Sequence, residues 1–350
     1  MVIILRKVIL TTCPIIILFV SVSCQYGTYP QDHEQLSADE RIVIRFSHVV
    51  GEDTPKGQAS RKFAELVESR TDGYVEVQVF PNSFLYRDGE EFDALLKGDV
   101  QMIAPSTSKV TKLVPEWQVI DLPFAFNSDQ EVNEYLESPA GQVLWDKLKR
   151  EGLYPLAFWN NGFKQMTNNR NPLIDLADFK NLRFRVMSSE VLEEQFSLLG
   201  AQAHVDAFDQ VYPLLEKGEI DAQENTFSNI VNKNIHTQQE YMTISNHGYL
   251  GYLVLMNEKF WQNLSDEIQI VLLESMQEVT EWERGIAEEI NRENRQTLEQ
   301  CDCVNLHELT HEERVVWERA LEPLYDSFTE QFGDKYIHYI PKFKKERSYN

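Results

Sequence analysis

A long amphipathic stretch in the last third of the chain places the strongest constraint on the fold. Between Ser265 and about Gln300, apolar residues recur at spacings of three or four: Ile268, Leu272, Met276, Val279, Trp282, Ile286 and Ile290. Ser265 is placed to cap this helix, and two acidic residues in its first turn favour the helix dipole. About 35 residues at a rise of 1.5 Å each reach about 50 Å, which exceeds most single domains. The stretch therefore predicts a strut that bridges two domains, and the alternative is an ordinary amphipathic core helix.

Length and charge agree with two domains and limit the kinds of partner. The chain has 350 residues, and at about 150 residues per domain this predicts roughly two domains. Lys and Arg number 33 against 56 Asp and Glu, so the formal net charge is −23 at pH 7. A field of this sign repels nucleic-acid phosphates, which makes nucleic acid a poor partner. An anionic ligand needs a local positive site to be held against the overall charge.

Strand and helix patterns alternate from residue 41 onward, which predicts an α/β fold. The expected elements are a strand at Ile42–Phe46, a helix at Thr54–Arg70, a strand at Tyr74–Phe80, a helix at Glu90–Lys97 ended by Gly98, and a strand at 99–104. This order favours helices around a mostly parallel sheet. No Pro/Gly/Ser-rich linker divides residues 41–340, so two domains require the chain to cross between them more than once, as in hinged clefts.

The N-terminus is typical of a secretory signal peptide. A short basic region precedes an apolar stretch of 15 residues, 8–22, which is shorter than the roughly 20 residues that span a bilayer. Ser21 and Ser23 place small residues at positions −3 and −1 before Cys24, which predicts a signal peptide over 1–23 and export. The same site resembles a lipoprotein box with Cys24 as the acylated residue, although Ser21 stands where Leu is usual. The alternative is a retained anchor helix, and the polar residues 24–40 indicate a flexible tether.

One motif suggests a metalloenzyme, but its context argues against it. His307-Glu308-Leu309-Thr310-His311 matches HExxH, in which both His lie on one helix face and hold zinc. Here Thr310 and Glu313 form a capping box, and the residues before His307 indicate the end of a strand. The motif is therefore expected to straddle a strand–loop–helix junction, where the two His do not share a helical face.

The cysteines and the remaining motifs add little chemistry. Cys301-Asp302-Cys303 has CxC spacing without a second pair, so a strained disulfide or two surface thiols are favoured over a metal site. No P-loop, no GxGxxG after a strand and no GxSxG elbow occurs, and enzyme signatures are essentially absent.

Basic residues are informative because they are scarce. Lys164, Arg170, Arg183 and Arg185 cluster in a strongly acidic chain. In the segment RFRV, alternation points Arg183 and Arg185 to the same side of a strand. One interpretation is two solvated arginines on an edge strand. The other is a guanidinium presented in a cleft, where its planar fork grips a carboxylate with two hydrogen bonds.

The order of motifs along the chain resembles a known family of receptors. The segments are SHVVGEDTPKGQASRKFAELVESRTDGYVEVQVFPNSFL, DVQMIAPS, IDLPFAF, FWNNGFKQMTNN, NLRFRV and AFDQVYPLLEKGEIDAQENT. Together they are similar to the extracytoplasmic solute receptors of tripartite ATP-independent periplasmic (TRAP) transporters, the dicarboxylate-receptor family. The resemblance covers about residues 42–330.

This resemblance implies a binding protein and not an enzyme, with no cofactor and no metal. The implied fold is of the periplasmic-binding-protein type II kind, with two α/β domains that close on one organic acid across a hinged cleft. Domain I is expected at 41–161 plus about 250–289, and domain II at 162–249 plus about 290–340. The implied location is periplasmic or extracytoplasmic, and the implied partners are a small carboxylate and the TRAP permease.

The resemblance also implies a set of ligand-binding residues. Arg185 matches the position that pairs with the ligand carboxylate, and Asn225 the position that hydrogen-bonds the same region. The rest of the set is Phe208 as an aromatic wall, Lys164 as a second cation, and His48 and Ser106 in first-domain loops at the cleft. Such loops follow the carboxyl ends of strands, where open α/β sheets bind ligands.

Departures from the family pattern leave the substrate open. Lys164 replaces the commoner Arg, which puts a second bidentate clamp in doubt. Asn181 and Tyr86 stand where glycine is usual, and His204 and Asp206 are further candidates for the pocket wall. The substrate candidates are a C4-dicarboxylate, a 2-oxo or 2-hydroxy monocarboxylate, and an acidic sugar. Two other functions remain as alternatives: a secreted zinc enzyme that uses the HELTH motif, and a binding protein that feeds a sensor.

Overall fold

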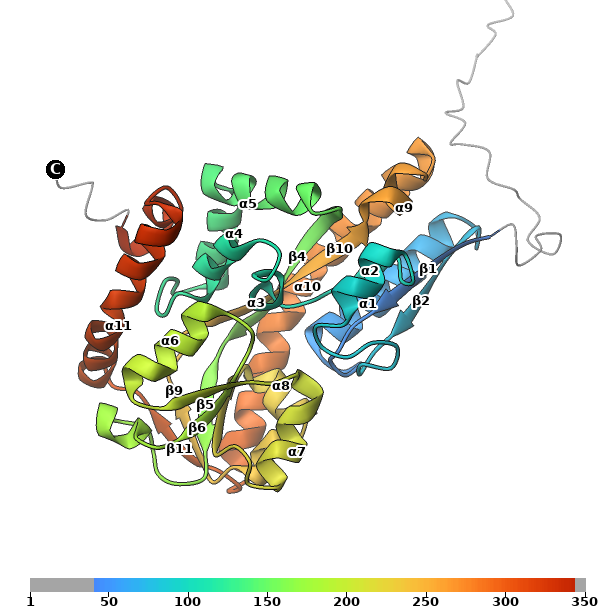
Figure 1. Cartoon of the computed structure of the whole chain (residues 1–350). Coiled ribbons are helices and arrows are strands. Elements are labelled where there is room, and N and C mark those ends of the chain that lie inside the picture. The colour runs from blue at the N-terminus through green and yellow to red at the C-terminus, as the bar shows by residue number, and fades with distance from the viewer. Residues whose placement is uncertain (1–40, 344–350) are drawn as a thin grey trace, which may run out of the picture.

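The computed structural model of this chain describes residues 41–343 and contains two separate β-sheets flanked by helices (Figure 1). The first sheet has the strand order β2-β1-β3-β10-β4, and the second has the order β11-β9-β5-β8-β6-β7. The strands of the first sheet are β1 (Ile42–Ser47), β2 (Val75–Phe80), β3 (Met102–Ile103), β4 (Leu153–Phe163) and β10 (Tyr249–Asn257). Those of the second are β5 (Gln165–Asn168), β6 (Arg183–Val186), β7 (Gln202–Val205), β8 (Ala222–Asn225), β9 (Tyr241–Ile244) and β11 (Asn305–Glu308). The prediction of a two-domain α/β fold is confirmed.

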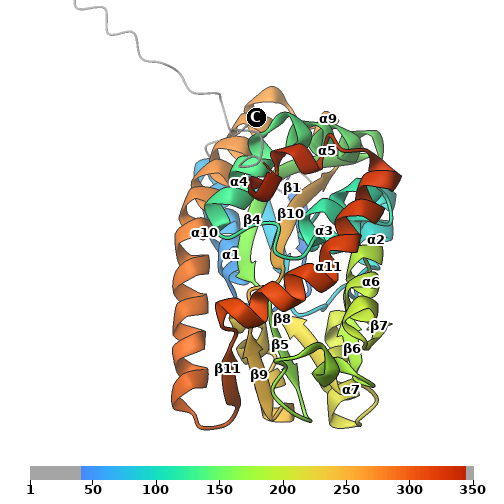
Figure 2. The ribbon, with the colours of Figure 1, turned by 90° about the vertical axis from the view of Figure 1, so that its left-hand side faces the viewer.

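Helices cover both sheets and differ widely in length. They are α1 (Pro55–Arg70), α2 (Glu91–Lys97), α3 (Thr107–Val110), α4 (Asp129–Glu137), α5 (Pro139–Arg150), α6 (Glu190–Leu199), α7 (Val211–Glu216), α8 (Phe227–Asn232), α9 (Glu258–Gln262), α10 (Asp266–Gln300) and α11 (His311–Phe332). Short 3-10 helices are η3 (Pro115–Asp121), η4 (Leu176–Phe179), η5 (Phe208–Gln210), η6 (Ile235–Gln238) and η7 (Ile337–Tyr339). Figure 2 shows α10 running along one side of the molecule past both sheets, with α11 crossing diagonally.

Local sequence accounts for the first elements. Thr54 caps α1 by accepting a hydrogen bond from the Gly57 amide at 3.2 Å, and Pro55 begins the helix. Gly98 ends α2 in the left-handed conformation with φ 84°. In β2 the alternating Val75 and Val77 are both buried, as the sequence pattern predicted.

The two sheets are mixed, so the expectation of a mostly parallel sheet needs correction. Strand β10 runs antiparallel to β3 and β4, and β5 runs antiparallel to β8 and β9. The reason lies in two strand pairs that pass from one sheet to the other. Strand β4 continues into β5 through Lys164 alone, and β9 returns to β10 through residues 245–248. The Lys164 amide donates to the Gly248 carbonyl at 2.8 Å, which joins the two crossings.

Helix α10 makes the third connection between the sheets. Ser265 caps it, as predicted, and its first half receives a hydrogen bond at 2.9 Å from Arg70 of α1 to Ser275. In its second half, Asn291 donates to the Asn161 carbonyl at 2.6 Å and accepts from the Ser228 amide of α8 at 3.0 Å. The prediction of a bridging strut is therefore confirmed. The exact domain limits stay a prediction, and the chain changes sheet at Lys164 and at 245–248.

The N-terminal features lie outside the described residues. This applies to the signal peptide at 1–23, the tether at 24–40 and the acylation candidate Cys24. Within residues 41–343, no helix has the length and apolar character that a membrane crossing requires.

Candidate ligand-binding site

A cavity between the two sheets collects most of the residues that the family resemblance implied. It has an empty volume of about 320 Å³. Its wall on the side of the first sheet consists of Val49, Val50, Asp88, Ser106, Leu250 and Tyr252. The wall on the side of the second sheet consists of Arg185, Met187, Phe208, Asn225 and Asn229. Several of these residues follow the carboxyl ends of parallel strands, which is where α/β sheets bind ligands.

Arg185 presents one edge of its guanidinium to the cavity. Strand β6 lies between β8 and β7, so Arg185 is not on an edge strand, and its side chain is 1% exposed. Its Nε and Nη2 donate to the Asp206 carbonyl at 2.9 and 2.7 Å, which fixes the other edge. Among residues 41–343, no hydrogen bond engages Nη1. The fork is therefore oriented and keeps donors for a carboxylate.

Arg183, two residues earlier, has a different role. Its Nε and Nη2 both bond the Asp221 carboxylate at 2.9 Å, and its side chain is 35% exposed. The hydrogen bonds from Arg183 hold the pKa of Asp221 down, at about 2. Arg183 therefore forms a surface ion pair outside the cavity.

Two neutral side chains add donors to the cavity wall. The Asn225 Oδ1 accepts from the Thr226 amide at 3.1 Å and from Asn229 Nδ2 at 2.8 Å. This pairing orients Asn225, whose Nδ2 takes part in no hydrogen bond within the described part of the chain. Ser106 lies opposite, in the segment that bridges to Tyr252 of β10. Phe208 supplies an aromatic face, with its ring centroid 5.9 Å from the Arg185 guanidinium carbon.

Lys164, expected as a second cation of the site, does not line the cavity. Its side chain is 0% exposed, and its Nζ bonds Glu224 Oε1 at 2.6 Å. The other oxygen of Glu224 contacts His247 Nε2 at 2.7 Å, and His247 Nδ1 contacts Ser245 Oγ at 2.7 Å. Burial alone raises the pKa of Glu224, but Lys164 and His247 outweigh it and hold this pKa at about 2. The cluster lies buried where the chain crosses between the sheets. The charge of Lys164 is neutralised there by Glu224.

His48 also lies outside the cavity wall. It is fully buried. Burial and the neighbouring Lys56 lower its pKa well below the usual value, so the ring is neutral. The two residues that follow it, Val49 and Val50, form the wall instead.

Sequence reasoning missed Asp88 and Tyr252. Tyr252 belongs to β10, a strand buried on both faces that offers no alternation to detect. Asp88 lies in the loop between β2 and α2, where no periodic pattern marks it. Of the two extra candidates, Asp206 contributes its backbone carbonyl to Arg185, whereas His204 lies in β7 outside the wall.

Asn181 and Tyr86, which stand where the family usually has glycine, differ in backbone conformation. Asn181 has φ 64°, a left-handed conformation that Asn tolerates better than other non-glycine residues. Asn181 therefore adopts a backbone conformation that glycine also adopts readily. Tyr86 has no positive φ and packs against the core.

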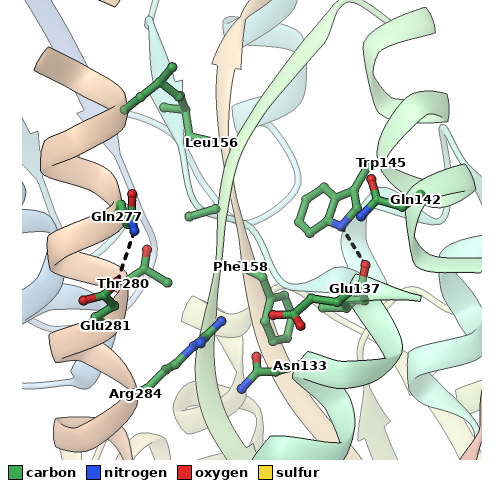
Figure 3. A pocket seen from close by; sticks show the side chains of 13 residues that line it. Asn133, Glu137, Gln142, Trp145, Leu156, Phe158, Gln277, Thr280, Glu281 and Arg284 are labelled. Atoms are coloured by element: carbon green, nitrogen blue, oxygen red, sulfur yellow. Dashed lines mark hydrogen bonds between the residues drawn. The ribbon is translucent and has the colours of Figure 1, made fainter. Parts of the chain in front are cut away.

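A larger hollow lies between α4, α5, β4 and α10, and it does not lie between the two sheets (Figure 3). It has an empty volume of about 1050 Å³ and is lined only by α4, α5, β4 and α10. Figure 3 shows Arg284 and Glu281 on the side of α10 and Glu137 on the opposite side. Trp145 Nε1 is already bonded to the Leu136 carbonyl at 3.3 Å. No strand of the second sheet contributes to its wall, so closure of the two sheets cannot enclose a ligand there.

The HELTH motif has the geometry that the sequence predicted. His307 lies in β11, and His311 is the first residue of α11, so the two rings do not share a helix face. Thr310 and Glu313 form the capping box, and Glu313 Oε2 also contacts His307 Nε2 at 2.9 Å. Residues 41–343 contain no group of three or more His, Cys, Asp or Glu side chains that could hold a metal ion. The open question about Cys301 and Cys303 is answered by a disulfide between them.

Comparison with known proteins agrees with this geometry. Residues 46–331 match the family described as bacterial extracellular solute-binding protein, family 7. The chain is 43% identical over 315 residues to the C4-dicarboxylate-binding protein DctB of Bacillus subtilis, covering 90% of each chain. It is 44% identical to the C4-dicarboxylate-binding periplasmic protein DctP of Rhodobacter capsulatus, covering 85% of this chain and 90% of that one. The crystal structure of a TRAP periplasmic solute-binding protein from Shewanella oneidensis with bound succinate superposes with a TM-score of 0.84 and 40% identity, covering 86% of this chain and 98% of that one.

Proposed function

Because this chain belongs to family 7 of the bacterial extracellular solute-binding proteins, we propose that it captures a C4-dicarboxylate outside the cell and delivers it to a TRAP permease. The protein is a solute receptor, and it closes two α/β domains on a small organic acid. The single observation that supports the site is the buried, oriented Arg185 in the cavity wall, whose Nη1 takes part in no hydrogen bond among residues 41–343.

The chemistry of the cavity wall favours an organic acid. Arg185 supplies a buried cation, and Ser106 and Asn225 supply polar side chains. The relatives named for C4-dicarboxylates and the neighbour that holds succinate point to the same class.

The second carboxylate of such a ligand needs a cation. Two buried lysines on the side of the first sheet contact residues of the cavity wall and are better candidates than Lys164. Lys109 is 7% exposed and contacts Asp88 of the cavity wall at 3.0 Å. Lys56 is fully buried, donates to the Ala104 carbonyl at 2.7 Å, and lies 3.7 Å from the ring centroid of Tyr252. Both amines therefore lie directly behind cavity residues.

The proposal also includes delivery of the ligand to a permease and attachment of the receptor to the membrane. Export places the receptor in the extracytoplasmic space, and acylation of Cys24 would hold it at the membrane. A receptor that feeds a sensor would use the same cavity. Uptake of labelled succinate by reconstituted permease separates these roles, because a sensor receptor does not stimulate uptake.

Calorimetric titration tests the substrate class and the site together. The ligands are succinate, malate and fumarate, with pyruvate and glucuronate as other acid classes. Arg185→Lys loses the fork and should weaken binding of the best diacid about thirtyfold, roughly 2 kcal/mol. Arg185→Ala should cost about 3–5 kcal/mol, because buried charge pairs lose this much when one partner is truncated.

A matched control is available two residues away. Arg183→Lys alters the same strand but leaves the cavity intact, so its affinity should stay within about twofold of the unmodified protein. Equal binding by Arg185→Ala and the unmodified protein would refute the assigned site. Tight binding of glucuronate without binding of any diacid would refute the substrate class.

A further inference from the structure

Three residues of the loop between β2 and α2 reach from the first sheet to the second. Asn82 accepts a hydrogen bond from Lys233 at 2.9 Å, and Arg87 lies 3.6 Å from Asp209. The third contact, Asp88 to Arg185 at 3.7 Å, lies inside the cavity wall. The loop therefore touches the other half of the molecule where the cavity closes.

Asp88 gathers donors from both sides on one oxygen. Its Oδ2 lies 3.0 Å from Lys109 Nζ and 3.7 Å from Arg185 Nη2. The same oxygen accepts a hydrogen bond from the Phe208 amide at 2.9 Å. The side chain is 6% exposed, so these contacts are made away from bulk water.

Closure without a ligand creates an electrostatic problem at Arg185. The side chain is 1% exposed, and the Asp206 carbonyl that bonds its Nε edge carries no net charge. A buried guanidinium without a counter-charge is penalised by several kcal/mol. Burial lowers the pKa of Arg185, and Asp88 is the acid that opposes this most, ahead of Glu224 and the aspartates of the neighbouring loop.

We propose that Asp88 is the internal counter-ion of Arg185, which allows the empty receptor to close and which the ligand carboxylate must replace. This inference rests on the proposed function of the same cavity. The contact with Arg185 is longer than the one with Lys109, so Asp88 can release Arg185 while it stays bound to Lys109 and to the Phe208 amide. Asp88 therefore competes with the ligand and lowers its affinity.

Asp88→Asn tests the competition because it removes the charge and keeps an acceptor for the Phe208 amide. Titration with succinate should give a dissociation constant at least fivefold lower than that of the unmodified protein. Damage to the fold weakens binding, so a gain in affinity cannot arise from damage. Asp88→Ser also lacks the charge, so titration of this second variant with succinate should likewise give a tighter affinity than that of the unmodified protein.

Arg87→Gln is the matched control. Arg87 precedes Asp88 and also reaches across the cleft, but its side chain is 63% exposed and outside the cavity wall. An exposed pair of this kind contributes little, so the affinity for succinate should stay within about twofold. A gain in this variant equal to that of Asp88→Asn would overturn the specific role of Asp88.

A second measurement does not depend on any ligand. Spin labels on α2 and α7 report the distance between the two halves in the empty protein. The unmodified protein should show a closed population that shrinks in Asp88→Asn. Unchanged distances, or an affinity for succinate that is equal or weaker in both charge-free variants, overturn the inference. If the unmodified protein binds no diacid, the proposed function fails separately, and the label distances still decide the role of Asp88.

Discussion

Replacing Lys164 by Met removes the cation from the buried cluster at the crossing between the sheets. The side chains have similar length, so packing around the aliphatic part is kept. Glu224 is left 1% exposed with His247 as its remaining contact within this cluster. The change therefore isolates the electrostatic contribution of Lys164 from its volume.

The expected loss of unfolding free energy at pH 7 is about 3 kcal/mol. Truncating one partner of a buried ion pair typically costs about 3–5 kcal/mol, because a buried charge is left uncompensated. The lower end applies here because His247 can take up a proton. Lys164 and burial both lower the pKa of His247, and Glu224 raises it, so removal of Lys164 favours the imidazolium.

The pH dependence separates charge from packing. In the unmodified protein the pKa of Glu224 is lowered from 4.5 to about 2, so its contribution is present above pH 4.5 and is lost as the pH falls toward 2. Without Lys164 this pKa rises, and protonation of Glu224 relieves the buried charge at a higher pH. Urea denaturation between pH 4 and 7 should therefore show a deficit that is largest at pH 7 and shrinks on acidification. A deficit of the same size at every pH would refute the electrostatic argument.

Two further predictions concern other parts of the chain. Replacing His307 and His311 together by Ala should leave the affinity for the best diacid within about threefold, under roughly 0.7 kcal/mol, in calorimetric titration; zinc that binds stoichiometrically and is lost in this variant would contradict the prediction. Export should cleave the chain between Ser23 and Cys24, which the intact mass of the mature protein measures. A chain that still begins at residue 1 contradicts cleavage, and an added diacylglyceryl mass would identify a lipid-anchored form.

Elements with strong local patterns were predictable from the sequence. Helix α10 has a capping Ser265 and an apolar residue every three or four positions, so its start and the buried face of its first half follow from local rules. In its second half the buried positions include Glu283 and Ala287, whereas the expected residues Trp282, Ile286 and Ile290 are only partly buried. Strand β2 and helix α1 likewise carry their own alternation and cap. Arg185 became a candidate because a lone basic cluster in an acidic chain is conspicuous, and the family resemblance selected it over Arg183; the structure places it in the cavity wall.

Partners distant in the sequence were not predictable by the same rules. Lys164 was expected as a second cation of the site because the local sequence does not reveal its partner Glu224, which lies 60 residues away in the chain. Asp88 escaped notice because its partners, Lys109, Arg185 and the Phe208 amide, come from three separate segments. The antiparallel pairing of β4 with β10 depends on the same kind of long-range contact.

The local charge around the cavity explains how an acidic chain can hold an anion. The buried cations Lys56, Lys109 and Arg185 lie in or directly behind the wall, and Asp88 is the charged acid among them. Burial raises the pKa of Glu91 to about 8, so at pH 7 this neighbour is mostly protonated and adds little negative charge. Three buried cations thus lie around one ionised carboxylate of the wall, although the whole chain has a formal charge of −23. Glu224, Asp206 and Asp209 also offset the charge of Arg185. Salt screens the exposed charges beyond about 8 Å, whereas buried charges are screened much less. Because Arg185 lies on the side of the second sheet and Lys56 and Lys109 lie on the side of the first, each end of a dicarboxylate has a buried cation nearby, whereas a monocarboxylate uses only one side.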